Sequence, residues 1–367
     1  MLKSRLKSAL ISGLFLLSSV IYAQTPERIK LGMSVALSGP ASHIGMQLKG
    51  GHQLYFEYAN EHVLDEKAQL DLLVLDDGYE PNRTVDNIHY LIQHHKIHAL
   101  IGNMGTPTAH AIKDILKRHQ LPFLMPYTGA NFLYNNPQFP TYTLRPSYLE
   151  EAQEQIKYLV DELGHKKIAL FIQADEFGLT LEQSHRQALR DKNIEPVVIA
   201  RFRRNTNAVA RALTQILLTD TTAIAMIGTY EPLAAFINQA YRAGFRGTYT
   251  SVSFVSSGAL FDNIIAPAQV MVTEVLPNPN TCKGQVCTLY RRLSADKKGA
   301  VSYQSFEGFV NAFVFVEALK HCDVETFSKC IVPAIKKERS TNPAIQALFK
   351  QQKSRAEHPV YRSYLKY

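Results

Sequence analysis

The sequence predicts an α/β protein built from two doubly wound, Rossmann-like lobes. Apolar strands alternate with amphipathic helices along the chain, and the same alternation appears once before Pro146 and again after it. Near-continuous apolar strands are typical of parallel sheets that helices cover on both faces. A chain of about 340 residues without its N-terminal leader also suits two domains better than one.

The first series contains four predicted strands, at residues 29–37, 70–75, 97–101 and 123–125, and a helical pattern follows each of the first three. The second series opens with Ser147 and Glu150, the spacing of a helix capping box. Its predicted strands lie at residues 167–172, 223–227 and 249–254. A further strand at 270–276 returns toward the first lobe, where the apolar helix at 306–319 packs.

The N-terminus has the three-part plan of a secretory signal. Lys3, Arg5 and Lys7 precede an apolar run at residues 9–20, which ends in a small-residue cleavage site near Ala23. A retained anchor is the alternative, but the run is short for a membrane span. We therefore expect export to the periplasm. The sequence has no cysteine near the cleavage site, which argues against a lipid anchor.

The charge pattern argues against nucleic acid as a partner. The formal charge is +8, but the basic residues are scattered and form no stripe or recognised module. Enzyme signatures are also missing, including phosphate-binding loops, zinc-protease motifs and the nucleophile elbow. Asp76 and Asp77 follow a strand without a partnered base, so we expect them to accept hydrogen bonds in a turn. We predict no enzyme activity, no cofactor and no metal.

The four cysteines form two local pairs, which suggests disulfides in an oxidising compartment. The favoured pairing joins Cys282 with Cys287 and Cys322 with Cys330. A zinc site is the alternative, but it would normally have tighter spacing. Each loop is short, so each bridge would act as a local staple.

Ligands of open parallel sheets bind beyond the carboxyl ends of the strands. Loops of suitable composition follow three strands of the first series, at residues 38–45, 102–108 and 126–131. In the second loop Thr106 could cap a helix with Pro107 at its first position. The same geometry could instead bind an anion, and the sequence favours neither interpretation.

These residues together resemble the type 1 periplasmic binding proteins of branched-chain amino acid (leucine/isoleucine/valine) ABC transporters. The resemblance spans nearly the whole mature chain and rests on the order and spacing of several motifs. These are Ser38-Gly39-Pro40 with Gly45, Asp76-Asp77, the Gly102 loop, residues 126–130, Lys167-Ile168-Ala169 before Phe177-Gly178, and Ser305-Phe306-Glu307-Gly308.

The resemblance implies two lobes joined by a three-segment hinge, which close on a ligand. It divides the chain into a signal peptide at 1–23, a first lobe at 24–146 plus about 275–341, and a second lobe at 147–274 plus about 342–367. It also implies a monomer, with a small-molecule solute and an inner-membrane ABC permease as partners.

The same resemblance assigns the ligand contacts. A ligand carboxylate would be held in the first lobe, and an aromatic residue of the second lobe would close over it. The implied ligand-binding residues are Gly105, Thr106, Thr128, Gly129, Ala130, Phe177, Tyr230 and Ser253, and the implied pocket border is Ile44, Tyr127 and Phe309.

Ser253 departs from the family pattern. Members that bind amino acids place an acidic residue there to hold the ammonium group, and a hydroxyl cannot pair with a buried cation. The sequence therefore favours a carboxylate without the amine, or a short amide, within the broader class of small carboxylate-bearing or amino-acid-like solutes. Glu307 could supply the missing charge, and a hinge or packing role is its alternative.

Two other functions compete with transport. A sensor that signals to a membrane receptor or kinase could use the same fold, because fold does not fix function. Neighbouring permease and ATPase genes would favour transport, and neighbouring sensor genes would favour signalling. An exported hydrolase would need a nucleophile and a base converging in the cleft, and the sequence shows no signature of them.

Overall fold

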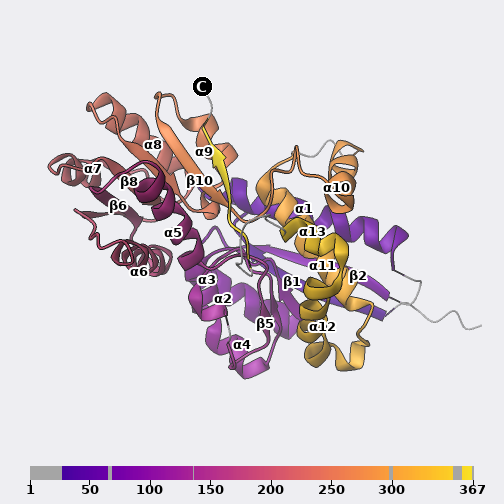
Figure 1. Ribbon diagram of the computed structural model, residues 1–367. Helices are drawn as coiled ribbons and strands as arrows, with labels where there is room; N and C mark the ends of the chain where they lie inside the picture. The colour runs from indigo at the N-terminus through magenta and orange to yellow at the C-terminus, as the bar shows by residue number, and fades with distance from the viewer. Residues whose placement is uncertain (1–26, 65–67, 135, 297–300, 350–357, 366–367) are drawn as a thin grey trace, which may run out of the picture.

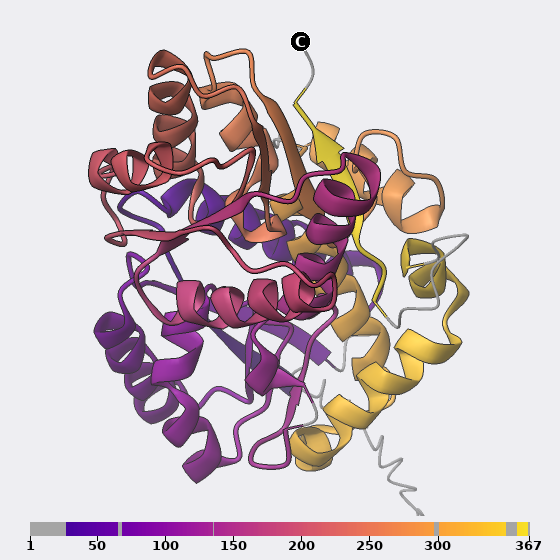
Figure 2. The ribbon, with the colours of Figure 1, turned by 60° about the vertical axis from the view of Figure 1, so that its left-hand side comes forward.

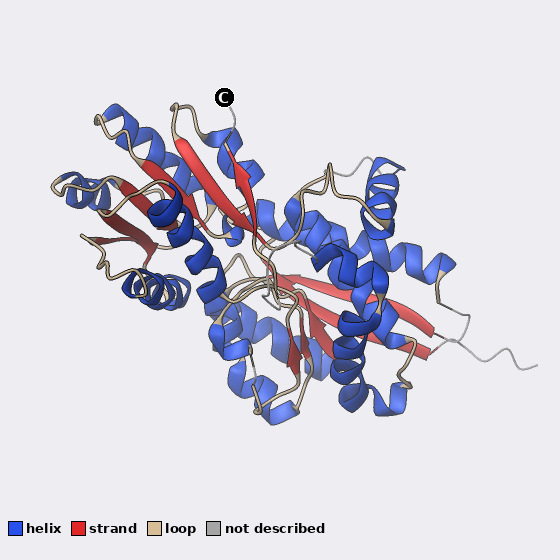
Figure 3. Cartoon of the chain, viewed as in Figure 1, coloured by secondary structure: helices blue, strands red, loops and turns tan. Residues whose placement is uncertain are grey.

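The computed structural model describes residues 27–64, 68–134, 136–296, 301–349 and 358–365 and contains two α/β lobes joined at their centre (Figure 1). Each lobe has its own sheet, with helices on both faces (Figure 3). The predicted signal segment and its cleavage site lie outside the described residues. Two parallel-sheet lobes confirm the predicted fold class.

The sheet of lobe 1 has five parallel strands in the order β2-β1-β3-β4-β5. The strands are β1 (Glu27–Val35), β2 (Ala68–Asp76), β3 (Ala99–Ile101), β4 (Phe123–Leu124) and β5 (Thr141–Tyr142). The helices between them are α1 (Ser42–His62), α2 (Pro81–Tyr90), α3 (Thr106–Ala111) and α4 (Lys113–His119). The sequence missed β5, because two half-buried residues carry no periodic signal.

The sheet of lobe 2 has six strands in the order β11-β10-β9-β8-β6-β7, and only β11 runs antiparallel to its neighbour. The strands are β6 (Ile168–Gln173), β7 (Ile199–Phe202), β8 (Ala223–Ile227), β9 (Thr248–Ser251), β10 (Gln269–Glu274) and β11 (Tyr361–Tyr364). The helices are α5 (Tyr148–Ile156), α6 (Glu176–Arg190), α7 (Ala210–Leu217), α8 (Tyr230–Arg242) and α9 (Ser257–Asn263).

Helix α5 begins with the capping box that the sequence predicted. The Ser147 side chain accepts a hydrogen bond from Glu150 N, and the Glu150 carboxylate accepts one from Ser147 N. The predicted strand at 249–254 is wrong at its end, because β9 stops at Ser251 and residues Ser253–Val255 form a 3-10 turn. That turn takes Ser253 and Phe254 out of the sheet.

Both sheets share one connectivity. Strands β1 to β5 and strands β6 to β10 each follow the order 2-1-3-4-5 of a doubly wound sheet. In such sheets the strand order reverses beside the first strand, and ligands bind at the carboxyl ends there. The two reversal points lie between β1 and β3 and between β6 and β8, so each lobe offers one half of a site.

After β10 the chain returns to lobe 1 with four helices, α10 (Gln285–Asp296), α11 (Tyr303–Leu319), α12 (Phe327–Thr341) and α13 (Pro343–Phe349). Helix α11 packs closely on α1 because glycines face the contact. A Cβ on Gly51 would lie 1.9 Å from Ser305 O, and one on Gly308 would lie 2.3 Å from Leu48 O.

The sequence placed the final return to lobe 2 too early, at about residue 342. Helix α13 packs in lobe 1, where Ile345 and Leu348 are buried in the same core as α11 and α12. The later strand β11 pairs with β10 in lobe 2 (Figure 2). A short apolar helix beside a larger apolar helix carries no sequence signal that tells which lobe it joins.

The predicted cysteine pairing is confirmed, because Cys282 is bonded to Cys287 and Cys322 to Cys330. The first disulfide joins the loop before α10 to the first turn of that helix, and the second joins the chain just after α11 to α12. Within the described ranges, no helix combines the length and apolar character that crossing a bilayer requires.

Candidate functional site

The two lobes meet at the carboxyl ends of their strands, and several of the predicted site residues lie there. Thr106 and Thr128 come from loops of lobe 1, and Phe177 comes from the start of α6 in lobe 2. Their exposed fractions are 1%, 0% and 0%. The lobes are therefore in contact across the predicted site.

Three hydroxyl groups form a buried cluster on the lobe 1 side. Thr106 Oγ1 lies 2.7 Å from Thr128 Oγ1, and Thr128 Oγ1 donates to Tyr148 Oη at 3.1 Å. The distance from Thr106 Oγ1 to Tyr148 Oη is 3.4 Å. Gly129 O accepts from Tyr148 N, and Ala130 N donates to Thr128 Oγ1, which fixes the loop around the cluster.

This hydroxyl cluster corrects the interpretation of Thr106 as a helix cap. The cap position of α3 belongs to Gly105, and Thr106 is the first helical residue. Gly105 has φ = +105°, and a Cβ there would lie 2.4 Å from Tyr79 Cε2. Glycine thus allows the Tyr79 ring to lie against the loop, while the Thr106 hydroxyl turns toward Thr128.

An aromatic cluster lies next to these hydroxyls, with Phe254 at its centre. The Phe254 ring centroid lies 4.7 Å from that of Phe177, 5.3 Å from Tyr127 and 5.8 Å from Tyr79. Phe177 also contacts the Tyr148 ring at 5.6 Å. The cluster joins rings from both lobes, and aromatic pairs at these separations are favourable.

Sequence reasoning missed Tyr79, Tyr148 and Phe254. Tyr79 follows Asp77, whose carboxylate accepts from Tyr79 N at 2.9 Å and from Ser34 Oγ at 2.7 Å. Asp77 is thus a turn-forming acceptor, as the sequence indicated. The signal that could have found the three aromatic residues is their position directly after strand ends or at the capping box.

Several polar atoms at the strand ends are buried without a hydrogen-bond partner among the described residues. These are Tyr79 Oη, Gln173 Oε1 and both side-chain polar atoms of Asn103. Exposed fractions of the three residues are 0%, 1% and 2%. A buried polar group without a partner lowers the stability of the fold by about 1–3 kcal/mol, so such groups are rare in native proteins and point to a functional role.

Ser253 lies in a different network, which we call the hinge network because it adjoins the predicted boundary between the lobes at residue 146. Ser253 N and Oγ donate to the Glu151 carboxylate at 2.8 and 2.9 Å, and Arg145 donates to Ser253 Oγ. Arg145 Nη1 lies 2.9 Å from both carboxylate oxygens of Glu307. The Arg145 guanidinium also lies 4.2 Å over the Tyr127 ring.

Arg145 is 2% exposed, and Glu151 and Glu307 are 0% and 5% exposed. Burial alone would lower the pKa of Arg145, but the Glu307 carboxylate raises it above its ordinary value. The guanidinium is therefore a fixed positive charge between the lobes. Its contact with Glu307 fits the hinge or packing role, one of the two alternatives that the sequence left open for that residue.

A second set of contacts joins the lobes at the rim of the site. Glu80 of lobe 1 accepts from Arg204 Nη2 at 2.6 Å and from Asn205 Nδ2 at 2.7 Å. The Tyr230 ring lies 5.8 Å from that of His43 across the same boundary. Tyr230 is thus at the rim rather than in the aromatic cluster.

The predicted pocket-border residues fall in different places. Tyr127 belongs to the aromatic cluster, and its hydroxyl donates to Ser253 O at 3.2 Å. Ile44 is buried in the core next to the site. Phe309 packs between Tyr55 and Tyr290, at 5.0 and 5.3 Å, within the helices of lobe 1, so the structure does not bring it to the hydroxyls.

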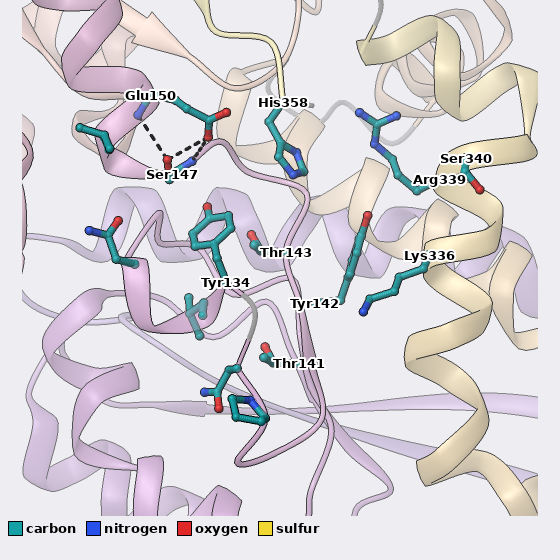
Figure 4. A pocket seen from close by; sticks show the side chains of 15 residues that line it. Tyr134, Thr141, Tyr142, Thr143, Ser147, Glu150, Lys336, Arg339, Ser340 and His358 are labelled. Carbon is teal, nitrogen blue, oxygen red and sulfur yellow. Dashed lines mark hydrogen bonds between the residues drawn. The ribbon is translucent and has the colours of Figure 1, made fainter. Parts of the chain in front are cut away.

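Two open pockets lie elsewhere, and neither is lined by a predicted site residue. One of about 910 Å³ lies in lobe 1 beside α12, with the Ser147–Glu150 capping box on its wall (Figure 4). The other, of about 840 Å³, lies between α1, α9 and β11. The described residues include no group of three or more His, Cys, Asp or Glu side chains arranged to hold a metal.

Comparison with known proteins gives one family match, to a family described as periplasmic binding protein, over residues 28–365. Among solved structures, the chain is 31% identical to a possible leucine/isoleucine/valine-binding protein from Rhodopirellula baltica. That match covers 89% of this chain and 90% of the other, with a TM-score of 0.82.

Two further structures show the same arrangement. A substrate-binding periplasmic protein from Ralstonia solanacearum is 25% identical, over 92% of this chain and 96% of its own, with a TM-score of 0.80. A branched-chain amino acid ABC transporter protein from Thermus thermophilus with bound valine is 17% identical, over 85% and 82%, with a TM-score of 0.74. At that identity the second match supports the fold alone.

Proposed function

The chain belongs to the periplasmic binding protein family, and from that premise we propose that it is the substrate-binding component of an ABC transporter. Its ligand is a small carboxylate-bearing or amino-acid-like solute, held between the lobes. The protein is exported after cleavage near Ala23, acts as a monomer and delivers the solute to an inner-membrane permease. It catalyses no reaction.

The observation that carries this proposal is the pairing of the hydroxyl cluster with unsatisfied polar atoms at the lobe contact. Among the described residues, the three hydroxyls of Thr106, Thr128 and Tyr148 bond only to one another or to Ala130 N, so they can turn toward a carboxylate. Burial raises the pKa of Tyr148 to about 12, so its phenol keeps its proton at neutral pH and can donate it in a hydrogen bond.

The side chains of Tyr79 and Gln173 supply the second part of the argument. They come from lobes 1 and 2 and lie near each other, yet Tyr79 Oη and Gln173 Oε1 make no hydrogen bond of good geometry among the described residues, so a polar group of a ligand between the lobes could bond to both. A ligand that binds both lobes favours the closed arrangement, since binding can shift a conformational equilibrium only through a difference in affinity. Contacts such as Glu80 with Arg204 then stabilise that closed form.

Thermal unfolding of the purified mature protein, measured against a panel of solutes, tests the proposal. A ligand that binds only the folded protein raises the melting temperature by mass action. We expect a rise with at least one carboxylic acid, amino acid or amide. No shift with any solute, and no solute co-purified, would contradict solute binding. Loss of uptake of the bound solute in a deletion strain then tests the transport role.

A further inference from the structure

A bound ammonium group would need a carboxylate that is free to pair with it. Around the hydroxyl and aromatic clusters, the carboxylates of the described residues already accept hydrogen bonds from the protein. Glu307 is held by Arg145, and Asp175 accepts from Phe177 N, Gly178 N and Gln173 Nε2. At the rim, Glu80 is held by Arg204 and Asn205.

Glu151 lies on helix α5 with Tyr148, and its carboxylate already accepts several hydrogen bonds from the protein. Its two oxygens accept from Ser253 N, Ser253 Oγ and Thr273 Oγ1, at 2.8, 2.9 and 2.6 Å. Arg145 Nη2 lies 4.0 Å away. A buried carboxylate with three donors and a neighbouring guanidinium has little capacity left for a ligand cation.

Arg145 brings a positive charge to the position beside Ser253. Its guanidinium lies 4.2 Å over the Tyr127 ring, which contacts the Phe254 ring at 5.3 Å, so the charge borders the aromatic cluster. A ligand ammonium there would meet a cation whose carboxylate partners are already engaged, and a buried charge without a partner is costly.

From this geometry, and resting on the proposed function, we propose that the interlobe site selects carboxylic acids that carry no α-ammonium group. Arg145, seated on Ser253 and held by Glu307, is the residue that excludes the amine. The hydroxyls of Thr106, Thr128 and Tyr148 receive the carboxylate, and the rings around Phe254 receive the apolar remainder of the ligand.

Calorimetric titration with two matched pairs of ligands tests the selectivity. The pairs are 4-methylpentanoate with leucine and 3-phenylpropanoate with phenylalanine, which differ within each pair only by the amine. We expect the amine-free acid to bind at least about 100-fold more tightly in one pair or both, because the ammonium would be buried unpaired.

Either of two results overturns the inference. One is an amino acid that binds as tightly as its amine-free partner. The other is no binding of either amine-free acid while another solute of a wider panel binds, in which case the proposed function stands and the selectivity does not. If no solute binds at all, the proposed function itself fails, and the inference fails with it.

The variant Arg145→Met tests the assigned residue. It removes the cation and frees Glu307, so the amino acid should bind more tightly. The selectivity ratio, which is the affinity for the amine-free acid divided by that for the matched amino acid, should therefore fall at least about tenfold. The double variant Arg145→Met/Glu307→Gln removes both charges and protects the fold. The preference of the double variant for the amine-free acid should lie between that of Arg145→Met and that of the unmodified protein. An unchanged ratio in the folded variants would exclude Arg145 as the determinant.

Discussion

Two regions join the lobes, and they differ in how they treat their buried polar groups. At the hinge, Arg145 contacts Glu307 and Ser253, and Ser253 contacts Glu151, so that only Arg145 Nε lacks a partner in this network. In the candidate site, Tyr79 Oη and Gln173 Oε1 have no hydrogen-bond partner of good geometry among the described residues, although both residues are buried.

The difference distinguishes a polar network that is largely complete by itself from one that a ligand could complete. A network whose members satisfy one another fixes the relative position of two chain segments and needs nothing else. A contact between two lobes that leaves polar atoms unpaired is more favourable when a ligand lies between them, since the ligand can make the missing hydrogen bonds. Mutations in the hinge network should therefore mainly lower stability. Mutations in the candidate site should mainly change binding.

The largest expected effect is at the hinge. Arg145→Met should lower the free energy of unfolding by about 3–5 kcal/mol, because the Glu307 carboxylate stays buried without its partner. Urea unfolding measures the loss. The double variant with Glu307→Gln should be more stable than the sum of the two single losses predicts, and simple additivity would contradict the pairing.

The hinge side should also respond to pH through Glu274. Burial raises the pKa of Glu274 from 4.5 to about 8, although Ser257 and Ser363 donate hydrogen bonds to it. The folded protein therefore holds this proton more tightly than the unfolded chain. Its contribution to stability is fully present below about pH 4.5 and is lost as the pH rises through about 8.

Between these values, the free energy of unfolding should fall by up to about 1.4 kcal/mol per pH unit from this group alone. The variant Glu274→Gln cannot titrate, so its stability should fall less steeply over the same range. Urea unfolding at several pH values between 5 and 8 measures both slopes. Equal slopes in the two proteins would show that Glu274 does not hold a proton.

In the candidate site, Thr106→Val should weaken binding of a carboxylate about tenfold, since one donor is lost while the shape is kept. Titration with the ligand found in the solute panel measures the change. Thr141→Val is the matched control, because its hydroxyl donates to Phe123 O within lobe 1. An equal loss of affinity in both variants would point to a general disturbance of the lobe.

The smallest effects come from single phenol groups and should differ in sign. Tyr79→Phe removes a buried hydroxyl that makes no hydrogen bond of good geometry among the described residues, so the ligand-free protein should gain up to about 1 kcal/mol. Tyr127→Phe removes a hydroxyl that bonds to Ser253 O and Gln304, and should lose about 1 kcal/mol. Chemical unfolding without ligand measures both, and a loss in both variants would contradict the comparison.

Much of the fold could be predicted because its signals are local. The apolar runs at residues 168–173 and 223–227 are fully buried strands, and Ser147 and Glu150 cap α5 as their spacing predicts. The strands β5, β7 and β11 were missed because they are short and mixed in polarity. Both disulfides were predicted correctly, since each closes a short loop.

The candidate site was predictable only in outline. The loops after β3 and β4 were identified from glycine and threonine at strand ends, and Thr106 and Thr128 do lie side by side. The role of Thr106 as a cap was wrong, because its hydroxyl found a partner 22 residues away that no local rule could name. Phe309 was placed at the pocket, but the packing of α11 on α1 keeps it in lobe 1.

The sequence by itself determined two repeated α/β lobes, the loops after strands of the first lobe that contribute to the candidate site, and the neutral residue at Ser253. Only the tertiary structure decided that Arg145 lies on Ser253 and that Phe254 stands among rings from both lobes. Arg145 and Glu307 are 162 residues apart, and the partner of a buried charge depends on how the lobes pack. Periodicity along the chain records which face of an element is buried, but not which distant side chain meets it there.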